Sequence, residues 1–192
     1  MQKVTLAILA GGKSSRLGGI DKALITVDGI PLISRIYNTF NGEVSEIIVI
    51  SNGNNGYPIE AKIFPDVIKN CGPLGGIHSA LTHAINPVVF VVSVDMPFVN
   101  NDVFHQLLNI YIQANAEVAV PMHGNLLEPL FGLYSTALEP KVRNILSDMQ
   151  GHPITDLLNV ADTHYLQLPD DFQTRMWFYN INTPDDLKAL EL

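Results

Sequence analysis

The residue types best suited to chemistry gather near the start of the chain, where an apolar run meets a loop rich in glycine and basic side chains. The run Val4–Leu9 stops just before Gly11 and Gly12, and three basic residues follow within ten positions, at Lys13, Arg16 and Lys22. Glycine leaves backbone N–H groups accessible, and lysine and arginine add positive charge. Since the whole chain carries a net charge of −8, this loop predicts a local anion site, suited to a polyphosphate, on an acidic protein.

Two well-known phosphate-binding loops do not fit this segment. A Walker A loop requires G-x-x-x-x-G-K-[ST], and no Lys-Ser or Lys-Thr pair closes the loop at the required distance. A dinucleotide-binding fingerprint requires G-x-G-x-x-G, which the pairs Gly11-Gly12 and Gly18-Gly19 do not supply. The sequence therefore favours a phosphate loop of another class, with a glycine-rich turn carrying solvated charges as the alternative.

Composition limits the classes of protein to consider. The length of 192 residues suits one well-packed domain, and 47% hydrophobic with 16% charged residues is typical of a globular chain. The acidic balance argues against nucleic acid or an anionic membrane as the main partner. Apolar runs are too short to span a bilayer, and no signal-peptide cleavage motif follows the first one. The single cysteine, Cys71, fits a packing role in a reducing cytoplasm, so we expect a cytoplasmic protein.

Apolar β-branched runs alternate with helical patterns along the chain. Strands are expected at Val4–Leu9, Ile47–Ser51, Ala61–Phe64, Val88–Val94 and Val118–Met122. Helices are expected at Pro31–Phe40, Gly75–Ala84 and Asp102–Gln113, with a last one capped by Thr183. Alternation of this kind indicates βαβ units. We therefore expect residues 1–192 to form a single α/β domain, a three-layer α/β/α sandwich around a mostly parallel sheet.

Polar residues follow several of these expected strands directly. Asn52 comes after the second strand, Asp66 after the third and Asp95 after the fourth. Ligands of open α/β sheets bind at the carboxyl ends of the strands. These three side chains and the first glycine loop are therefore expected at one edge of the sheet.

Asp95 is the best candidate for a metal ligand. It ends a buried strand and is followed by Met96-Pro97, and Mg²⁺ typically takes one or two protein carboxylates together with phosphate oxygens and water. The alternative is a turn residue ahead of proline. Lys22 could reach a phosphate on its flexible stem, or be solvated. The six histidines show no metal-ligand spacing.

Two further segments could have either a structural role or a role in the site. Gly72–Gly76 is a second glycine cluster, ahead of an expected helix, and could be a tight turn only. The segment Asn180–Pro184 starts the last helix and also carries two amide side chains, Asn180 and Asn182, that could reach the cleft.

These motifs together resemble those of the molybdopterin nucleotidyltransferases, which have a glycosyltransferase-A-like fold, and within them the molybdenum cofactor guanylyltransferases. The resemblance runs in the family's order over nearly the whole chain. The blocks that carry it are Leu9-Ala10-Gly11-Gly12, Ser14, Arg16, Gly18, Asp21-Lys22, Asp28–Leu32, Ser51-Asn52, Pro65-Asp66, Gly72–Ile77, Val94–Pro97, Pro129–Tyr134 and Asn180–Leu187. It implies a Rossmann-like architecture of the nucleotide-diphospho-sugar transferase type.

The resemblance also implies a reaction and its site. GMP would pass from GTP to the terminal phosphate of molybdopterin, giving molybdopterin guanine dinucleotide and pyrophosphate. The implied GTP contacts are Leu9, Ala10, Gly11, Gly12, Lys22, Asn52, Asp66 and Asp95, with Lys22, Arg16 and Asp95 catalytic, Asp95 the Mg²⁺ ligand, and Asn180 and Asn182 toward the acceptor. The amino-terminal part would bind GTP and magnesium and the carboxy-terminal part the acceptor. Other cofactor-biosynthesis proteins or apo-molybdoenzyme chaperones are candidate partners.

The implied chemistry agrees with the residues present. The attacking group is already a phosphate, so the site needs no protein nucleophile, and none is evident. Three alternatives remain open: a cytidylyltransferase of the same pathway, a more distant nucleotidyltransferase of this fold, and a nucleotide-binding module without catalysis. Relatives that use CTP carry alanine where this chain has Gly11, and a glycine there leaves more room for a purine. The resemblance therefore favours GTP.

Overall fold

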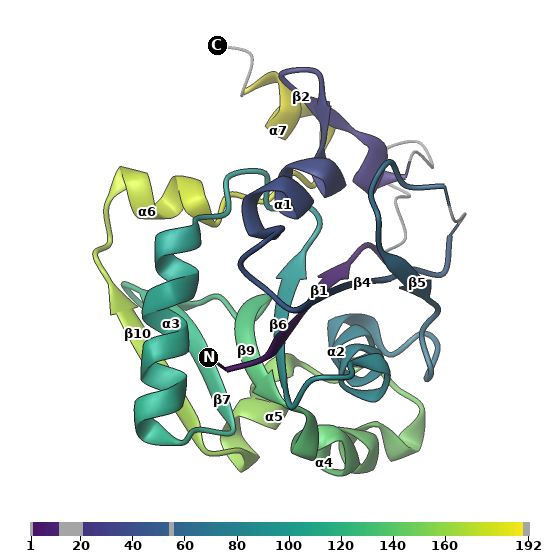
Figure 1. Cartoon of the computed structure of the whole chain (residues 1–192), viewed down its shortest axis with the longest axis vertical. Coiled ribbons are helices and arrows are strands. Elements are labelled where there is room, and N and C mark those ends of the chain that lie inside the picture. The colour runs from purple at the N-terminus through teal and green to yellow at the C-terminus, as the bar shows by residue number, and fades with distance from the viewer. Residues whose placement is uncertain (1, 12–20, 54–55, 190–192) are drawn as a thin grey trace.

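The computed structural model describes residues 2–11, 21–53 and 56–189 (Figure 1). Strand β1 (Val4–Leu9) pairs in parallel with β4 (Glu46–Ile50) on one side and with β6 (Val88–Ser93) on the other. Every residue of β1 and β6 is buried, which is why both sequences read as continuous apolar runs rather than alternating ones.

The sheet extends outward from these strands in the order β10-β7-β9-β6-β1-β4-β5, with β8 paired to β7. The outer strands are β5 (Lys62–Phe64), β7 (Val118–His123), β8 (Leu126–Leu127), β9 (Phe131–Ser135) and β10 (Thr163–Leu168). Strand β9 runs antiparallel to both β6 and β7, and β8 antiparallel to β7, whereas the other pairs are parallel. The expectation of a mostly parallel sheet is confirmed. A separate two-stranded sheet joins β2 (Thr26–Val27) and β3 (Ile30–Pro31).

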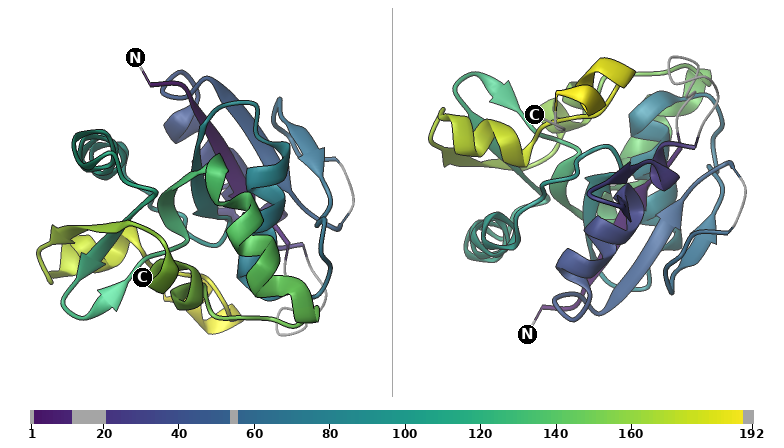
Figure 2. Two further views of the ribbon diagram at one scale, coloured as in Figure 1. Left: turned by 90° about the horizontal axis from the view of Figure 1, so that it is seen from below. Right: turned by 90° about the horizontal axis from the view of Figure 1, so that it is seen from above.

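Helices cover both faces of the large sheet, as the two views of Figure 2 show. One hydrophobic cluster includes residues of α1 (Leu32–Phe40) and α3 (Asn101–Ala114), and the other includes residues of α2 (Gly72–His83), α4 (Glu139–Ile145) and α5 (Ile154–Val160). The remaining helices are α6 (Phe172–Trp177) and α7 (Pro184–Lys188), with short 3₁₀ turns η2 (Lys22–Leu24), η3 (Thr136–Leu138) and η4 (Leu146–Asp148). The predicted α/β/α layering is confirmed. No helix of the described ranges is both long and apolar enough to cross a membrane.

Four phenylalanines fix the strand that leads to Asp95. Phe90 of β6 packs against Phe40 of α1 at 5.1 Å between ring centroids, against Phe104 of α3 at 4.7 Å and against Phe131 of β9 at 4.8 Å. Aromatic pairs at these separations contribute about 0.5–1.5 kcal/mol beyond simple burial. Strand β6 is therefore held at Phe90 by three neighbouring elements.

The second glycine cluster, expected ahead of a helix, lies within that helix. Helix α2 already begins at Gly72 rather than at Gly75. A Cβ on Gly75 would come within 2.9 Å of Cys71 Cβ, and one on Gly76 within 3.1 Å of Leu9 Cδ1. Glycine therefore allows the first turns of α2 to pack directly against the end of β1.

Candidate active site

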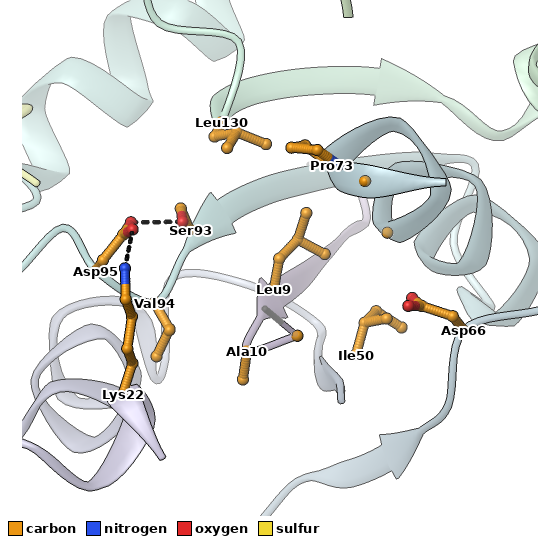
Figure 3. Close-up of a pocket in the computed structure, with 13 residues that line it drawn as sticks. Leu9, Ala10, Lys22, Ile50, Asp66, Pro73, Ser93, Val94, Asp95 and Leu130 are labelled. Atoms are coloured by element: carbon orange, nitrogen blue, oxygen red, sulfur yellow. Dashed lines mark hydrogen bonds and ion pairs between the residues drawn. The ribbon is translucent and has the colours of Figure 1, made fainter. Parts of the chain in front are cut away.

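A pocket opens where β1, β4 and β6 end and α2 begins, at the edge of the sheet that the strand pattern indicates (Figure 3). Its wall combines backbone and side chains from several chain segments. The lining residues are Leu9, Ala10, Gly11, Lys22, Ile50, Asp66, Gly72, Pro73, Gly76, Ser93, Val94, Asp95 and Leu130. Six of the residues expected to contact GTP, namely Leu9, Ala10, Gly11, Lys22, Asp66 and Asp95, line this pocket.

Lys22 and Asp95 face each other across one side of the pocket (Figure 3). The Lys22 Nζ lies 3.3 Å from Asp95 Oδ2 and donates a hydrogen bond of 2.9 Å to Asn182 Oδ1. Lys22 begins the turn η2, whose N-cap is Asp21: the Asp21 Oδ1 accepts from the backbone N–H of Ala23 at 3.0 Å. The cap fixes the backbone that carries Lys22. The Lys22 ammonium group contacts both Asp95 and Asn182, which lie far from it in the sequence.

The Asp95 carboxylate is oriented by its own strand. The Ser93 Oγ donates to Asp95 Oδ1 at 2.6 Å, which leaves Oδ2 to face Lys22. The backbone carbonyl of Asp95 accepts from the N–H of Ile181 at 2.9 Å, so the carboxy-terminal segment is tied to the same point. Sequence reasoning missed Ser93. The signal that could have found it is a hydroxyl residue at the end of the strand two positions before Asp95, since the turn after β6, closed by the Met96 N–H on the Ser93 carbonyl, brings the two side chains together.

Asp66 is held by a reciprocal pair of hydrogen bonds with Asn52. The Asn52 Nδ2 donates to Asp66 Oδ2 at 2.6 Å, and the Asp66 backbone N–H donates to Asn52 Oδ1 at 3.0 Å. A Cβ added to Gly11 would lie 4.0 Å from Asp66 Oδ2, so the carboxylate stands beside the backbone of the first loop. Asn52 itself lines a neighbouring polar hollow with Gly53 and Lys69, and thus orients Asp66 from outside the main pocket.

The two asparagines expected near the acceptor differ in the structure. Asn182 contacts Lys22, whereas the Asn180 Nδ2 donates to the backbone carbonyl of Phe178 at 2.9 Å. The Asp186 Oδ2 accepts from the backbone N–H of Asn182 at 2.8 Å and of Thr183 at 2.7 Å, within the capping box of α7. The structure thus brings Asn182 to Lys22 but not Asn180.

Two residues of the predicted site, Gly12 and Arg16, lie outside the described residues, as does Lys13. Among the residues that are described, the roles assigned to each side chain stay predictions. What the structure adds is that Leu9, Ala10, Gly11, Lys22, Asp66 and Asp95 line one pocket, with Asn52 and Asn182 bonded to two of them.

The oxygen donors at this pocket fit a divalent metal that is also held by phosphate. Within the described ranges, no group of three or more His, Cys, Asp and Glu side chains could hold an ion alone. Asp95 offers one carboxylate whose Oδ2 already faces a cation, Lys22 Nζ. Mg²⁺ binds in sites with one or two protein carboxylates when a substrate phosphate completes the coordination. A lone Asp95 therefore suits a metal that arrives with a nucleotide.

Comparison with known proteins agrees with this geometry. The family model described as a MobA-like NTP transferase domain matches residues 6–164. A protein of Clostridium perfringens named probable molybdenum cofactor guanylyltransferase is 34% identical, covering 99% of this chain and 97% of the relative. A Vibrio campbellii protein named molybdenum cofactor guanylyltransferase is 32% identical, covering 94% and 91%.

Solved structures give the same result. The crystal structure of molybdopterin-guanine dinucleotide biosynthesis protein A from Archaeoglobus fulgidus superposes with a TM-score of 0.80 at 26% identity, covering 97% of this chain and 96% of that one. A 2-C-methyl-D-erythritol 4-phosphate cytidylyltransferase from Thermus thermophilus shares the fold, with a TM-score of 0.71 at 17% identity over 99% and 98% of the two chains. Since the family model and relatives matched over nearly their full length agree, the chain belongs to the MobA-like NTP transferases and is a nucleotidyltransferase.

Proposed function

We propose that this protein transfers GMP from GTP to the terminal phosphate of molybdopterin, forming molybdopterin guanine dinucleotide and releasing pyrophosphate. The observation that carries the proposal is one pocket that combines Asp66, Lys22 and Asp95 with the backbone of Leu9–Gly11. The names of the full-length relatives support the same substrates. Residues 1–192 act as one domain, whose amino-terminal part binds GTP and the metal and whose carboxy-terminal part binds the acceptor.

Asp66 supports guanine over cytosine. A carboxylate only accepts hydrogen bonds. The pairing edge of guanine presents two adjacent donors, N1–H and the N2 amino group, whereas that of cytosine presents one donor and two acceptors. Asn52 fixes the Asp66 carboxylate, so a guanine edge meets a preset acceptor, while a cytosine edge brings its acceptors against a negative charge. Gly11 keeps the neighbouring wall free of a Cβ, which gives a purine room.

The chemistry is a displacement at the α-phosphorus of GTP. An oxygen of the acceptor phosphate forms a bond to this phosphorus, and the bond from phosphorus to the bridging oxygen breaks, so pyrophosphate leaves with the electron pair. Lys22, together with Arg16, offsets negative charge on the α-phosphate and on the leaving group. Asp95 holds Mg²⁺, which when bound supplies further positive charge to the phosphate oxygens. Positioning and charge neutralisation suffice because the nucleophile is already ionised.

The acceptor side is built from the carboxy-terminal segment. Asn182 reaches Lys22, so an acceptor phosphate bound beside it lies next to the cation that contacts GTP. Asn180, whose side chain donates to the backbone carbonyl of Phe178, makes no hydrogen bond to Lys22 among the described residues, so its part in binding the acceptor is the weaker assignment. Molybdopterin is the expected acceptor, and proteins that deliver it or receive the product are the expected protein partners.

The proposal is tested by incubating the purified chain with Mg²⁺, molybdopterin and either GTP or CTP, each labelled at the α-phosphate. We expect label on molybdopterin and stoichiometric pyrophosphate release from GTP. Transfer from CTP alone would identify a cytidylyltransferase instead. Nucleotide binding without transfer from either one would identify a binding module.

A further inference from the structure

A chain of hydrogen-bonded hydroxyl groups lies outside the lining of the pocket and outside the residues assigned to catalysis. Tyr57 follows the loop after β4, and its side chain is buried, with 9% of the residue exposed. The Tyr57 hydroxyl donates to Asp21 Oδ2 at 2.9 Å and lies 3.0 Å from the Ser51 Oγ. The Ser51 Oγ in turn accepts from the backbone N–H of Gly53 at 3.1 Å.

The directions of these bonds are settled by proton count. A carboxylate has no proton to give, so the single hydroxyl proton of Tyr57 goes to Asp21. Ser51 must therefore donate its own proton to the Tyr57 oxygen. The sequence runs from Gly53 N–H through Ser51 and Tyr57 to Asp21, and each hydroxyl donates once and accepts once. Burial raises the pKa of Tyr57, so its hydroxyl remains protonated and able to donate at neutral pH.

The two ends of this hydrogen-bonded chain lie close together, since a Cβ added to Gly53 would lie 3.9 Å from Asp21 Oδ2, and each end adjoins a residue that positions a side chain of the pocket. At one end, Gly53 adjoins Asn52, which orients Asp66. At the other end, Asp21 uses its second oxygen to cap the turn that carries Lys22. The Tyr57 hydroxyl therefore joins the segment that carries Asn52, the partner of Asp66, to the turn that carries Lys22.

We propose that Tyr57 is a positioning residue: its hydroxyl, acting through Asp21, holds the Lys22 ammonium where it reaches Asp95 and Asn182. This inference rests on the proposed function, because Lys22 acts there on the α-phosphate. Tyr57 itself touches no reacting atom. Packing needs only the aromatic ring, which the substitution Tyr57→Phe retains.

The first test compares Tyr57→Phe with the wild-type protein in the GTP-dependent transfer assay. Misplacing a catalytic group by a fraction of an ångström is expected to lower kcat by about tenfold while KM for GTP changes by less than about threefold. Tyr111→Phe is the matched control. Tyr111 is buried to the same degree, with 8% exposed, and it lines a separate hollow with Glu117 and Ser135, away from the pocket. Removing the Tyr111 hydroxyl should leave both kcat and KM for GTP unchanged.

The second test asks whether Tyr57 acts through Lys22. In a double-mutant cycle, Tyr57→Phe should lower kcat of the wild-type protein but not the residual kcat of Lys22→Ala, since the group being positioned is then absent. An equal loss in both backgrounds would show that the hydroxyl matters only to general packing and would overturn the inference. So would an unchanged kcat for Tyr57→Phe in an active protein.

A further variant keeps the inference testable should Tyr57→Phe not fold. Ser51→Ala removes the hydroxyl one step further from Lys22, and we expect a loss of kcat of about threefold in the wild-type background and none in Lys22→Ala. An identical loss in both backgrounds contradicts the inference here too. Failure of the proposed function is seen separately, since the wild-type protein would then transfer no GMP at all.

Discussion

The Nζ of Lys22 lies 3.3 Å from Oδ2 of Asp95, although the two residues are 73 positions apart in the sequence. The contact places a protein cation beside the carboxylate oxygen that a metal would use. The Ser93 hydroxyl engages the other oxygen, so both oxygens of Asp95 are engaged before a nucleotide binds. Under the proposed function, Asp95 would hold the metal and Lys22 would contact phosphate, so nucleotide binding would exchange the partners of both side chains.

This exchange predicts competition between Lys22 and a metal in the nucleotide-free protein. Lys22→Met removes the charge and keeps a long apolar stem, so Mn²⁺ should bind the free protein about three- to fivefold more tightly than it binds wild type, in keeping with the strength of a partly exposed ion pair. Electron paramagnetic resonance of unbound Mn²⁺ measures this. Asp95→Asn in the same background should abolish the gain, and equal Mn²⁺ affinities for wild type and Lys22→Met would contradict the exchange.

Asp95→Asn should retain the fold and lose most of the turnover. The amide keeps the size of the side chain and can still accept from Ser93, but it is a far poorer ligand for a hard cation. We expect kcat to fall by at least about 100-fold, with a melting temperature within about 4 °C of wild type. Asp102→Asn, on the exposed first turn of α3, is the control and should leave both kcat and the melting temperature unchanged. Near-normal turnover of Asp95→Asn in Mg²⁺ would remove Asp95 from the mechanism.

Asp66→Asn should relax the choice of base. The amide replaces one acceptor oxygen by a donor, so the two donors of the guanine edge no longer meet a matched partner. A site built to hydrogen-bond a substrate loses kcat/KM when one partner is missing, and we expect kcat/KM for GTP to fall by about 100-fold. The ratio of kcat/KM for GTP to that for CTP should fall by at least about tenfold. Competition between the two labelled nucleotides gives the ratio directly. A preserved ratio would mean that Asp66 does not read the base.

Stability should fall in acid through a pair far from the pocket. Lys141 and the backbone N–H of Asp162 bond to the carboxylate of Glu117 and hold its pKa below the ordinary value of 4.5. A carboxyl group with a lowered pKa in the folded state stabilises above its unfolded pKa and loses this contribution as pH falls through the folded value. The free energy of unfolding, measured with urea, should therefore fall more steeply below about pH 4.5 for wild type than for Glu117→Gln. Parallel pH curves for the two proteins would contradict the assignment.

The elements that frame the pocket could be predicted because their sequence signals are local. Strands β1 and β6 are apolar runs in which Thr5 and Ser93 are the polar residues, and the last helix begins with the N-cap Thr183, Pro184 at its first position and Asp186 completing a capping box. The carboxyl ends of parallel strands lie at the same edge of a sheet, so the sequence alone predicts that Asn52, Asp66 and Asp95 lie near one another.

Other parts depend on contacts that a single segment does not encode. Strand β9 is a clear apolar run, but its antiparallel direction between β6 and β7 follows from how the chain returns to the sheet. Strand β10 and helices α4 to α6 were not predicted. The three helices are only six or seven residues long, too short for a periodic pattern to stand out. They form through packing on the sheet.

The direction in which each side chain of the site points could not be predicted from the sequence. Asn180 and Asn182 are equivalent in sequence, yet only Asn182 meets Lys22, because Asp186 holds its backbone from the helix that follows. The role of Tyr57 depends on a bond to Asp21 across 36 positions. Spacing alone indicates neither relationship.

The most direct test of the central claim is a crystal structure of the protein with GTP and Mg²⁺. The account predicts that the guanine edge faces Asp66 and that the α-phosphate lies between Lys22 and Asp95, with the metal on Asp95 Oδ2 and the present ion pair broken. A nucleotide bound elsewhere, or a triphosphate that leaves Lys22 on Asp95, would contradict it.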